Sequence, residues 1–409
     1  MKKISVKKTF IIYFIFLVLA TIAIITSLYL RTAVADPIVK EPMTISEASS
    51  HYEVQVLGTI ESIFPDRNLA LIIARELEVT VGTSVSLSDL QGIRELSSRY
   101  LPPVIELTGI EYLESLKILS LSGIVDPSIN ITDLEPLRSL TNLEELNLAS
   151  NEIVDLTFLQ DLINLRKLTL TFNAINDLEP LTNLTNLEVL YLTANEITDL
   201  TPLMNLVDLQ VIHLDLNKVS DLMPIGYLTS LESLRLSGNE IIELTPLGEL
   251  SNLRGLVLVD NEITDLSPLS HLNSLEMLSV GWNNISDLSP IANLSNLIHL
   301  SMEANEITDL RPLSSLINLT ELDLQNNSII DISPLSNLSN LRLLFLYDNP
   351  ITDFSPLSSL INLRRLGLNV DHGSHHPLCE LIDAITQENQ NLSALGGGDF
   401  ATQNNLMCD

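Results

Sequence analysis

The stretch Leu143-Glu-Glu-Leu-Asn-Leu-Ala-Ser-Asn151 recurs along the middle of this 409-residue chain with a period of 22 residues. Its pattern, L-x-x-L-x-L-x-x-N, occurs ten times without insertion or deletion. Only Ile212, Val280 and Met302 replace a leucine, and all three are apolar. Self-similarity at a fixed period indicates a repeat architecture, in which each repeat buries its apolar face against its neighbours. The asparagines that end the ten copies are Asn151, Asn173, Asn195, Asn217, Asn239, Asn261, Asn283, Asn305, Asn327 and Asn349.

A second column of residues runs in phase with these asparagines. Prolines recur at the same spacing from Pro136 to Pro356, with Phe158 as the only gap. Weaker copies of the leucine pattern begin at Leu116 and Leu363. The pattern predicts a leucine-rich-repeat solenoid of the α/β class. Its curved parallel sheet is expected on the concave face, and short 3₁₀ or helical turns on the convex face.

The residues of one repeat explain this expectation. In L-x-L the leucines point to one side of a short strand, which leaves the interleaved residues on the concave face. The asparagine follows the strand, where its amide can satisfy backbone groups that the turn leaves unpaired. In the next segment, D-L-x-P-L, Asp is a good helix N-cap and Pro is tolerated at a first helical position. The ten asparagines are therefore expected to be structural.

The aspartate of that segment forms an acidic column, with Glu243 as its only variant. Stacked carboxylates about 5 Å apart repel one another. The favoured interpretation is that each Asp caps its own turn and stays solvated. The alternative is divalent-cation binding, for which one column supplies too few oxygen ligands per site. The aspartates are Asp133, Asp155, Asp177, Asp199, Asp221, Asp265, Asp287, Asp309, Asp331 and Asp353.

Composition narrows the possible functions. The chain has 21 Lys+Arg against 52 Asp+Glu, a formal net charge of −31. Nucleic-acid binding relies on clustered basic residues, so this acidity argues against a nucleic-acid partner. The sequence shows no G-x-S-x-G, no Gly-rich phosphate loop and no H-E-x-x-H motif. We therefore expect no enzymatic activity and no cofactor.

The N-terminus has the features of an export signal. Four lysines precede an uncharged, mostly apolar stretch, residues 9–30, and Ala33-Val-Ala35 follows it. A basic flank, an apolar run and an A-x-A site describe a secretory signal peptide. The run is also long enough to span a bilayer as an uncleaved anchor, which would be the only membrane contact. Either interpretation places the rest of the chain outside the cytoplasm, secreted or anchored by its N-terminus.

Both ends of a solenoid need caps. The stretches Leu69–Leu77 and Ser86–Ile93 are predicted to be amphipathic helices before the repeats, and Pro377–Glu388 a closing helix after them. We expect the following order, in a chain that is monomeric: signal peptide or membrane anchor, 1–35; linker, 36–60; helical N-terminal cap, 61–105; leucine-rich repeats, 106–370; C-terminal cap and tail, 371–409.

Three features of the chain belong together: the N-E-I-T-D-L-S-P-L repeats, the cap sequences Ile63–Leu69 and Ser86–Ile93, and the entry segment Glu106–Leu113. In this order they resemble the bacterial internalin-type surface proteins, over roughly residues 60–370. The resemblance implies an extracellular protein that binds a protein partner, a surface or host/cell-envelope protein, through its concave sheet. It implies no catalysis by the repeats.

Large aromatic and Arg side chains are the usual anchors of a protein interface. Tyr191, His213 and Arg235 occupy one strand position in three consecutive repeats, so they are predicted to lie side by side. Phe172 and Trp282 directly precede the asparagines of their repeats. The alternative is ordinary variation at exposed positions or, for the cluster near the C-terminal end, packing against the cap. The remaining candidate partner-binding residues are His299, Glu303, Phe345, Tyr347 and Arg365.

The C-terminal segment offers two further possibilities. Cys379 and Cys408 are candidates for a disulfide, because the chain is expected to be exported. Three histidines, His372, His375 and His376, lie close to Cys379, and His and Cys are zinc ligands. A solvated turn is the simpler interpretation, so we assign no metal site. The alternative function is a structural envelope-associated protein with a C-terminal metal site and no dedicated receptor.

Overall fold

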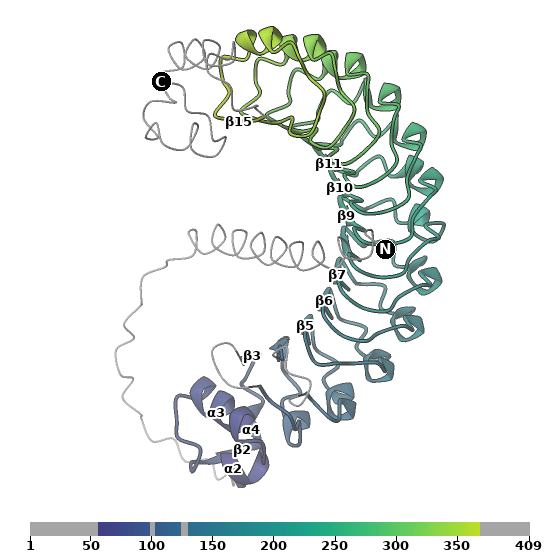
Figure 1. Cartoon of the computed structure of the whole chain (residues 1–409). Coiled ribbons are helices and arrows are strands. Elements are labelled where there is room, and N and C mark those ends of the chain that lie inside the picture. Colours follow the sequence, from purple (N-terminus) through teal and green to yellow (C-terminus); the bar gives the residue numbers. More distant parts are fainter. Residues whose placement is uncertain (1–55, 99–102, 124–129, 369–409) are drawn as a thin grey trace, which may run out of the picture. The chain divides into compact units, whose positions relative to one another are not determined.

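The computed structural model describes residues 56–98, 103–123 and 130–368. Within them, one 13-stranded parallel sheet runs in chain order from β3 to β15 along the inner side of a curved unit (Figure 1). This confirms the leucine-rich-repeat solenoid. The strands are β3 (Glu95–Ser97), β4 (Ile118–Ser120), β5 (Glu145–Asn147), β6 (Lys167–Thr169), β7 (Val189–Tyr191), β8 (Val211–His213), β9 (Ser233–Arg235), β10 (Gly255–Val257), β11 (Met277–Ser279), β12 (His299–Ser301), β13 (Glu321–Asp323), β14 (Leu343–Phe345) and β15 (Arg365–Gly367).

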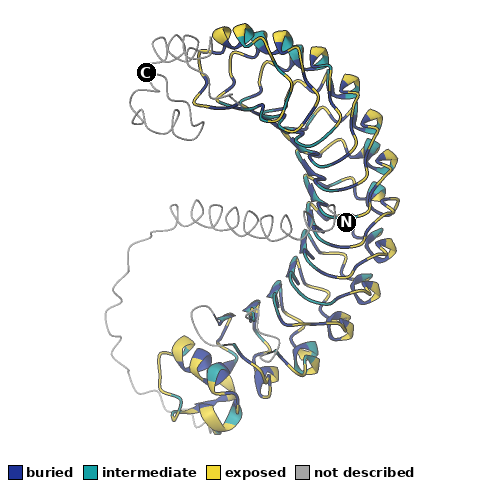
Figure 2. Cartoon of the chain, viewed as in Figure 1, coloured by how far each residue is buried: buried dark blue, intermediate teal, exposed yellow. Residues whose placement is uncertain are grey.

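Short 3₁₀ helices, labelled η, lie on the convex side of the unit, where most exposed residues also lie (Figure 2). In most of them Pro takes the first or second helical position, as in η5 and η9. The helices are η1 (Ile110–Tyr112), η2 (Glu135–Ser139), η3 (Thr157–Leu159), η4 (Glu179–Leu181), η5 (Thr201–Leu203), η6 (Ile225–Tyr227), η7 (Thr245–Glu249), η8 (Ser267–Leu269), η9 (Ser289–Ile291), η10 (Arg311–Ser315), η11 (Ser333–Asn337) and η12 (Ser355–Ser359).

The core lies between the sheet and these turns, and it is a ladder of aliphatic side chains. Leu190, Ile212 and Leu234 sit opposite one another on β7, β8 and β9, and all three are fully buried. Every repeat adds the same rung, so each repeat is stabilised mainly by its two neighbours. This explains how the chain combines 45% hydrophobic residues with only 4% aromatic residues.

The recurrent asparagine joins each repeat to the one before it. The Nδ2 of Asn195 donates to the carbonyls of Leu192 and Leu170, at 2.9 and 3.0 Å. Its Oδ1 accepts a hydrogen bond from the backbone N–H of Ile175 at 3.0 Å. The side chain is buried, and its partners are backbone groups that no strand or helix satisfies.

A second asparagine column, which the sequence analysis did not single out, performs a similar task at the surface. Asn186 precedes β7 and donates through Nδ2 to the carbonyl of Ile163 in the preceding repeat, at 2.8 Å. Asn164 and Asn252 make the equivalent bond at 2.8 and 3.0 Å. These bonds are exposed to solvent, unlike those of Asn195.

The acidic column consists of turn caps. Each of its ten aspartates accepts, through Oδ1, a hydrogen bond from the backbone N–H two residues ahead. In nine of the ten cases the Asp lies just before the N-cap residue of its 3₁₀ helix, whereas Asp221 lies three residues before Pro224, the N-cap of η6. Hydrogen bonds from Ser267 and Ser289 lower the pKa values of Asp265 and Asp287, while the charge of the next aspartate in the column raises them less. Capping therefore outweighs repulsion. In the described part of the chain, no group of three or more His, Cys, Asp or Glu residues could hold a metal ion.

A small α/β segment precedes the repeats. It comprises β1 (Val56–Thr59), α2 (Ile60–Ile63), α3 (Arg67–Glu76), β2 (Ser84–Ser86) and α4 (Leu87–Leu90), with β1 and β2 antiparallel. The Asp66 carboxylate caps α3 by accepting from Asn68 and Leu69, and it also accepts from the backbone of Ile105 and Glu106. One side chain thereby connects this segment to the entrance of the repeats.

The linker expected over 36–60 ends earlier than the sequence analysis supposed. Val56–Thr59 form β1 because they pair with Ser84–Ser86, and Ile60 begins α2 with its side chain buried. The expected signal peptide or anchor, the closing helix, both cysteines and the histidine cluster lie outside the described residues. Across the described ranges, no helix is both long and apolar enough to cross a membrane.

Candidate protein-binding face

The concave face is built by alternation along each strand. The central leucine of a strand points into the core, while the residues before and after it stay partly exposed, as in the intermediate–buried–intermediate pattern of β7 and β8. Parallel register then places equivalent residues of successive repeats next to one another. The candidate residues on the strands lie at these interleaved positions.

Tyr191, His213 and Arg235 form one continuous row. They are successive register partners on β7, β8 and β9. The rings of Tyr191 and His213 are 4.7 Å apart between centroids and tilted by 44°. The structure thus brings these three predicted residues together.

A buried aspartate that sequence reasoning missed fixes this row. Asp215 is 2% exposed; its Oδ2 accepts from Nε of Arg235 at 2.9 Å and its Oδ1 from the Ser237 backbone at 2.9 Å. Burial, together with the charge of Arg235, lowers the pKa of His213 to about 4, although Asp215 opposes the shift. The imidazole is therefore neutral at pH 7, and Arg235 carries the positive charge of the row. In the sequence, Asp215 could have been noticed as an acidic residue two positions after His213, in the repeat that precedes the one carrying Arg235.

Phe172 and Trp282 occupy left-handed backbone, with φ of 57° and 56°. The same position is left-handed in nearly every repeat and holds glycine only at Gly238. Such conformations cost bulky residues roughly 1–3 kcal/mol, and the surrounding structure must hold them in place. Here an inter-repeat bond does so, because the Trp282 N–H donates to the carbonyl of Glu303 at 2.7 Å.

The candidate residues between Tyr191 and Trp282 do not form one uninterrupted row of large side chains. β10 lies between Arg235 and Trp282, and its repeat presents small or nearly buried residues, Gly255, Val257 and Val259. The row that ends at Arg235 is therefore separated from Trp282 by a part of the sheet that carries only small or nearly buried side chains. Sequence spacing placed Tyr191, His213 and Arg235 in one column and Trp282 directly before its repeat's asparagine, without considering the small residues of the intervening repeat.

Several acidic residues lie on and just after β12 and β13, and the sequence analysis identified only Glu303 among them. Nδ1 of His299 lies 3.0 Å from Oε2 of Glu321 on the next strand. Glu303 contacts the hydroxyl of Ser301. Asp323, which was not predicted as a site residue, accepts from the backbone N–H of Gln325 at 3.1 Å. Burial raises the pKa of Asp323 to about 7, and it also raises the pKa of Glu303.

Phe345 and Tyr347 stack with ring centroids 6.4 Å apart and an angle of 18° between their planes. Gly367 lies opposite Phe345, and a Cβ at that glycine would approach a Tyr347 ring carbon to 2.2 Å. Arg365 is exposed on β15, beside Leu343 rather than beside the two rings. Of this predicted cluster, Phe345 and Tyr347 contact each other.

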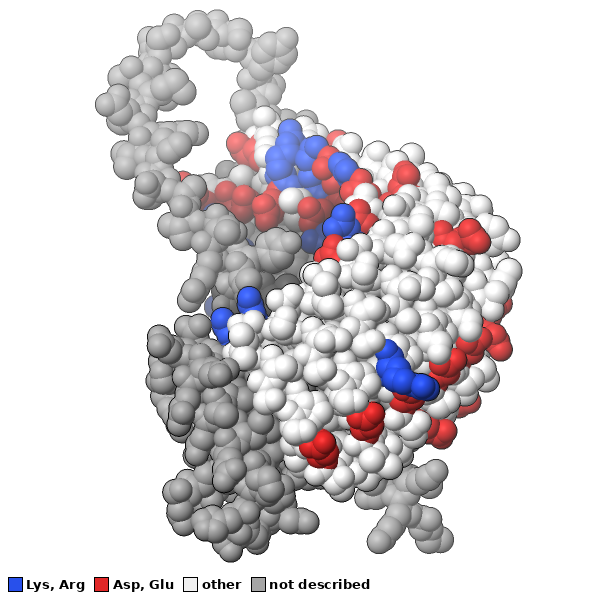
Figure 3. Space-filling model, turned by 90° about the horizontal axis from the view of Figure 1, so that it is seen from above, with Lys and Arg blue, Asp and Glu red and all other residues white. Residues whose placement is uncertain are grey.

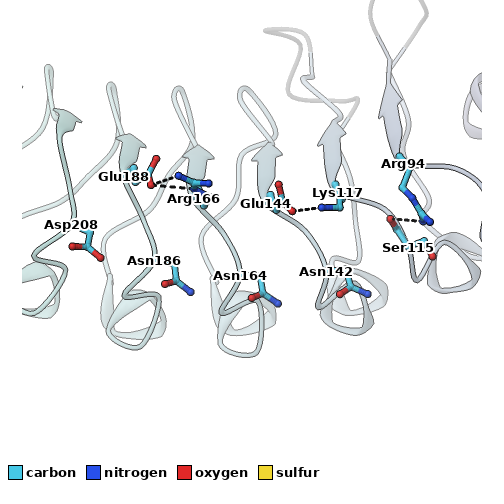
Figure 4. Close-up of a pocket in the computed structure, with 10 residues that line it drawn as sticks. All are labelled: Arg94, Ser115, Lys117, Asn142, Glu144, Asn164, Arg166, Asn186, Glu188 and Asp208. Atoms are coloured by element: carbon cyan, nitrogen blue, oxygen red, sulfur yellow. Dashed lines mark hydrogen bonds and ion pairs between the residues drawn. The ribbon is translucent and has the colours of Figure 1, made fainter.

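A groove of about 690 Å³ runs beside the first strands of the sheet (Figure 4). Four of its six charged side chains form two ion pairs, Lys117 with Glu144 and Arg166 with Glu188, each at 2.5 Å. Arg94 donates to the backbone carbonyls of Gln91 and Ser115. The hydrogen bond from Lys117 lowers the pKa of Glu144. Neutral ion pairs and backbone-bound asparagines leave little unmatched charge for a ligand. Acidic side chains also follow the rim of the face seen in Figure 3, where most other atoms are uncharged.

Comparisons with known proteins agree with this architecture. The family model "Leucine Rich repeats (2 copies)" matches residues 163–205, 251–293 and 295–337. A crystal structure of an internalin (inlF) from Listeria monocytogenes is 35% identical, with a TM-score of 0.67, over 77% of this chain and 98% of that one. The functional domain of InlJ, also from Listeria monocytogenes, is 24% identical with a TM-score of 0.66, over 78% of this chain and 68% of that one.

The ectodomain of a plant membrane receptor kinase from Arabidopsis thaliana, in complex with Casparian strip integrity factor 2, is 24% identical with a TM-score of 0.53. That match covers 69% of this chain and 43% of the receptor. The search of curated proteins found no match. The fold and face define a leucine-rich-repeat protein of the kind that commonly serves as a protein-interaction scaffold. Within that class, the chain belongs to the internalin family.

Proposed function

We propose that this chain is an exported, non-catalytic protein that binds a protein partner through the concave face of its sheet. The row Tyr191, His213 and Arg235 carries the proposal. Tyr and Arg are the side chains most enriched at interface hot spots, and Asp215 holds this arginine in one orientation before a partner arrives. A side chain that is already ordered loses less entropy on binding.

The N-terminal sequence supports export. The lysines, the apolar stretch 9–30 and the Ala33-Val-Ala35 site are the parts of a secretory signal, and an uncleaved stretch would serve as an anchor. A surface or host/cell-envelope protein is then the accessible class of partner. We propose that the chain acts as a monomer, with its partner occupying the sheet face.

The test uses two aromatic anchors. The whole chain first captures its partner from solubilised cell-surface proteins, and the affinity of the purified pair is then measured. In Tyr191→Ala/Trp282→Ala we expect the affinity to fall at least about tenfold, since each hot-spot truncation costs about 2 kcal/mol. Arg235 is left in place because its removal would strand the buried charge of Asp215 and destabilise the fold.

Tyr227→Ala is the matched control. Tyr227 ends the convex helix η6 and is 55% exposed, so its loss removes an aromatic side chain without touching the concave face. Its affinity should equal that of the unmodified chain. Unchanged binding by the concave variant would rule out the concave patch.

A further inference from the structure

Glu303 and Asp323 lie close together on the C-terminal part of the concave face. Glu303 follows β12, and Asp323 ends β13 as the register partner of Ser301. The residue before Glu303, Met302, donates its N–H to the Asp323 carbonyl at 2.8 Å. The negative charge of Glu303 contributes to the raised pKa of Asp323, so the two carboxyl groups repel each other electrostatically.

No cation compensates these two carboxyl groups within the described residues. On their own strands the neighbouring titratable side chains are His299 and Glu321, and Nδ1 of His299 lies 3.0 Å from Oε2 of Glu321. The strands on either side, β11 (Met277–Ser279) and β14 (Leu343–Phe345), carry no charged side chain. Among the described ion pairs, none includes Glu303 or Asp323.

This arrangement is unfavourable for the free protein. Withdrawing a carboxylate from water disfavours its charged form unless a cation or strong donors compensate. Here burial raises the pKa of Asp323 to about 7 and also raises the pKa of Glu303, so ionising both groups is disfavoured. A positive charge from outside would remove this penalty and let both carboxylates ionise.

Aromatic residues and a glycine surround the pair. Phe345 is the register partner of Asp323 and stacks on Tyr347. The backbone of Trp282 bonds to that of Glu303. Gly281 makes room for the acid, because a Cβ there would lie 2.2 Å from the Glu303 carboxyl carbon. Aromatic faces attract Lys and Arg, so charge and aromatic surface favour the same kind of group.

We propose that Glu303 and Asp323, flanked by Trp282 and Phe345, receive a lysine or arginine side chain of the protein partner. This inference rests on the proposed function, because it takes the concave face as the binding surface. The net charge of −31 would also draw a basic segment toward the chain. A free divalent cation fits less well, since calcium takes about 6–8 oxygen ligands.

The direct test is calorimetric titration of the full chain at pH 8 and low salt. The probe is an octapeptide of alternating glycine and lysine, and the comparison peptide carries norleucine in place of lysine. We expect only the lysine peptide to bind. Glu303→Gln/Asp323→Asn, which keeps the shape of both side chains, should weaken that binding about tenfold or more because it removes both charges. Lowering the pH from 8 to 5.5 should weaken it as well, because Asp323, with a pKa of about 7, takes up a proton.

Glu240→Gln/Glu262→Gln is the control for general charge attraction. Both glutamates are exposed in neighbouring repeats, and their replacement changes the net charge by the same amount. An equal loss in both double variants, or no binding of the lysine peptide, would overturn the proposal. If the peptide fails while Tyr191→Ala/Trp282→Ala still loses the native partner, the concave-face function stands and the basic-residue site falls.

Discussion

Replacing Asn195 by Ala is expected to lower the free energy of unfolding by about 3 kcal/mol, because it removes three buried hydrogen bonds and leaves one backbone N–H unpaired. The N–H of Ile175 loses its acceptor, while the carbonyls of Leu170 and Leu192 each lose one of two donors and keep the amides of Asn173 and Asn217. The site is too closed for full hydration, since Asn195 is 7% exposed. Thermal or urea unfolding of the full chain measures the change.

Asn186→Ala is the matched control for this prediction. It lies in the same repeat and also makes one inter-repeat bond, to the carbonyl of Ile163. Water can replace that exposed bond, so the expected loss is below about 1 kcal/mol. Equal losses in the two variants would show that the buried asparagine column does not hold the repeats together.

Replacing Asp323 by Asn is expected to stabilise the chain at pH 8 and to stabilise it clearly less at pH 5. The folded pKa is raised from 3.8 to about 7, so the folded state holds a proton more tightly than the unfolded state. That contribution is present below the unfolded pKa and is lost as pH rises through about 7. At one pKa unit per roughly 1.4 kcal/mol, and discounting for partial exposure, the variant should gain about 1–3 kcal/mol at pH 8.

Unfolding at pH 5 and pH 8 separates this from a general effect of charge. Glu240→Gln removes one exposed negative charge and should stabilise equally, and slightly, at both pH values. A loss of stability in Asp323→Asn at pH 8 would mean that the carboxylate is compensated in the folded chain. If Asp323→Asn is more stable at pH 8 but no longer binds the lysine peptide, Asp323 serves binding at a cost in stability.

Much of the fold could be predicted because the same physical requirement recurs in each repeat. The L-x-L leucines fix the face of the strand, and the asparagine and proline fix where the chain turns. The left-handed backbone at Phe172 and Trp282 could not be predicted, because neither is the glycine that this conformation favours. It is imposed by the bond between repeats rather than by the residue itself.

The site was less predictable for a related reason. Sequence spacing identified Tyr191, His213 and Arg235 as neighbours, because they share one position in consecutive strands. It gave no sign that Asp215 would be buried or that Asp323 would lack a cation, because both properties depend on side chains from adjacent repeats. Pattern predicts position along a solenoid, whereas burial and charge balance depend on its packing.

The central claim is that the concave face meets the partner, and site-specific photo-cross-linking tests it most directly. A benzophenone amino acid replaces Tyr191 on β7 in one variant and Tyr227 on η6 in another, both in the full chain. The two positions are tyrosines on opposite faces of the solenoid. We predict that the partner cross-links through position 191 and not through position 227. Cross-linking through 227 alone, or equally through both, would contradict the account.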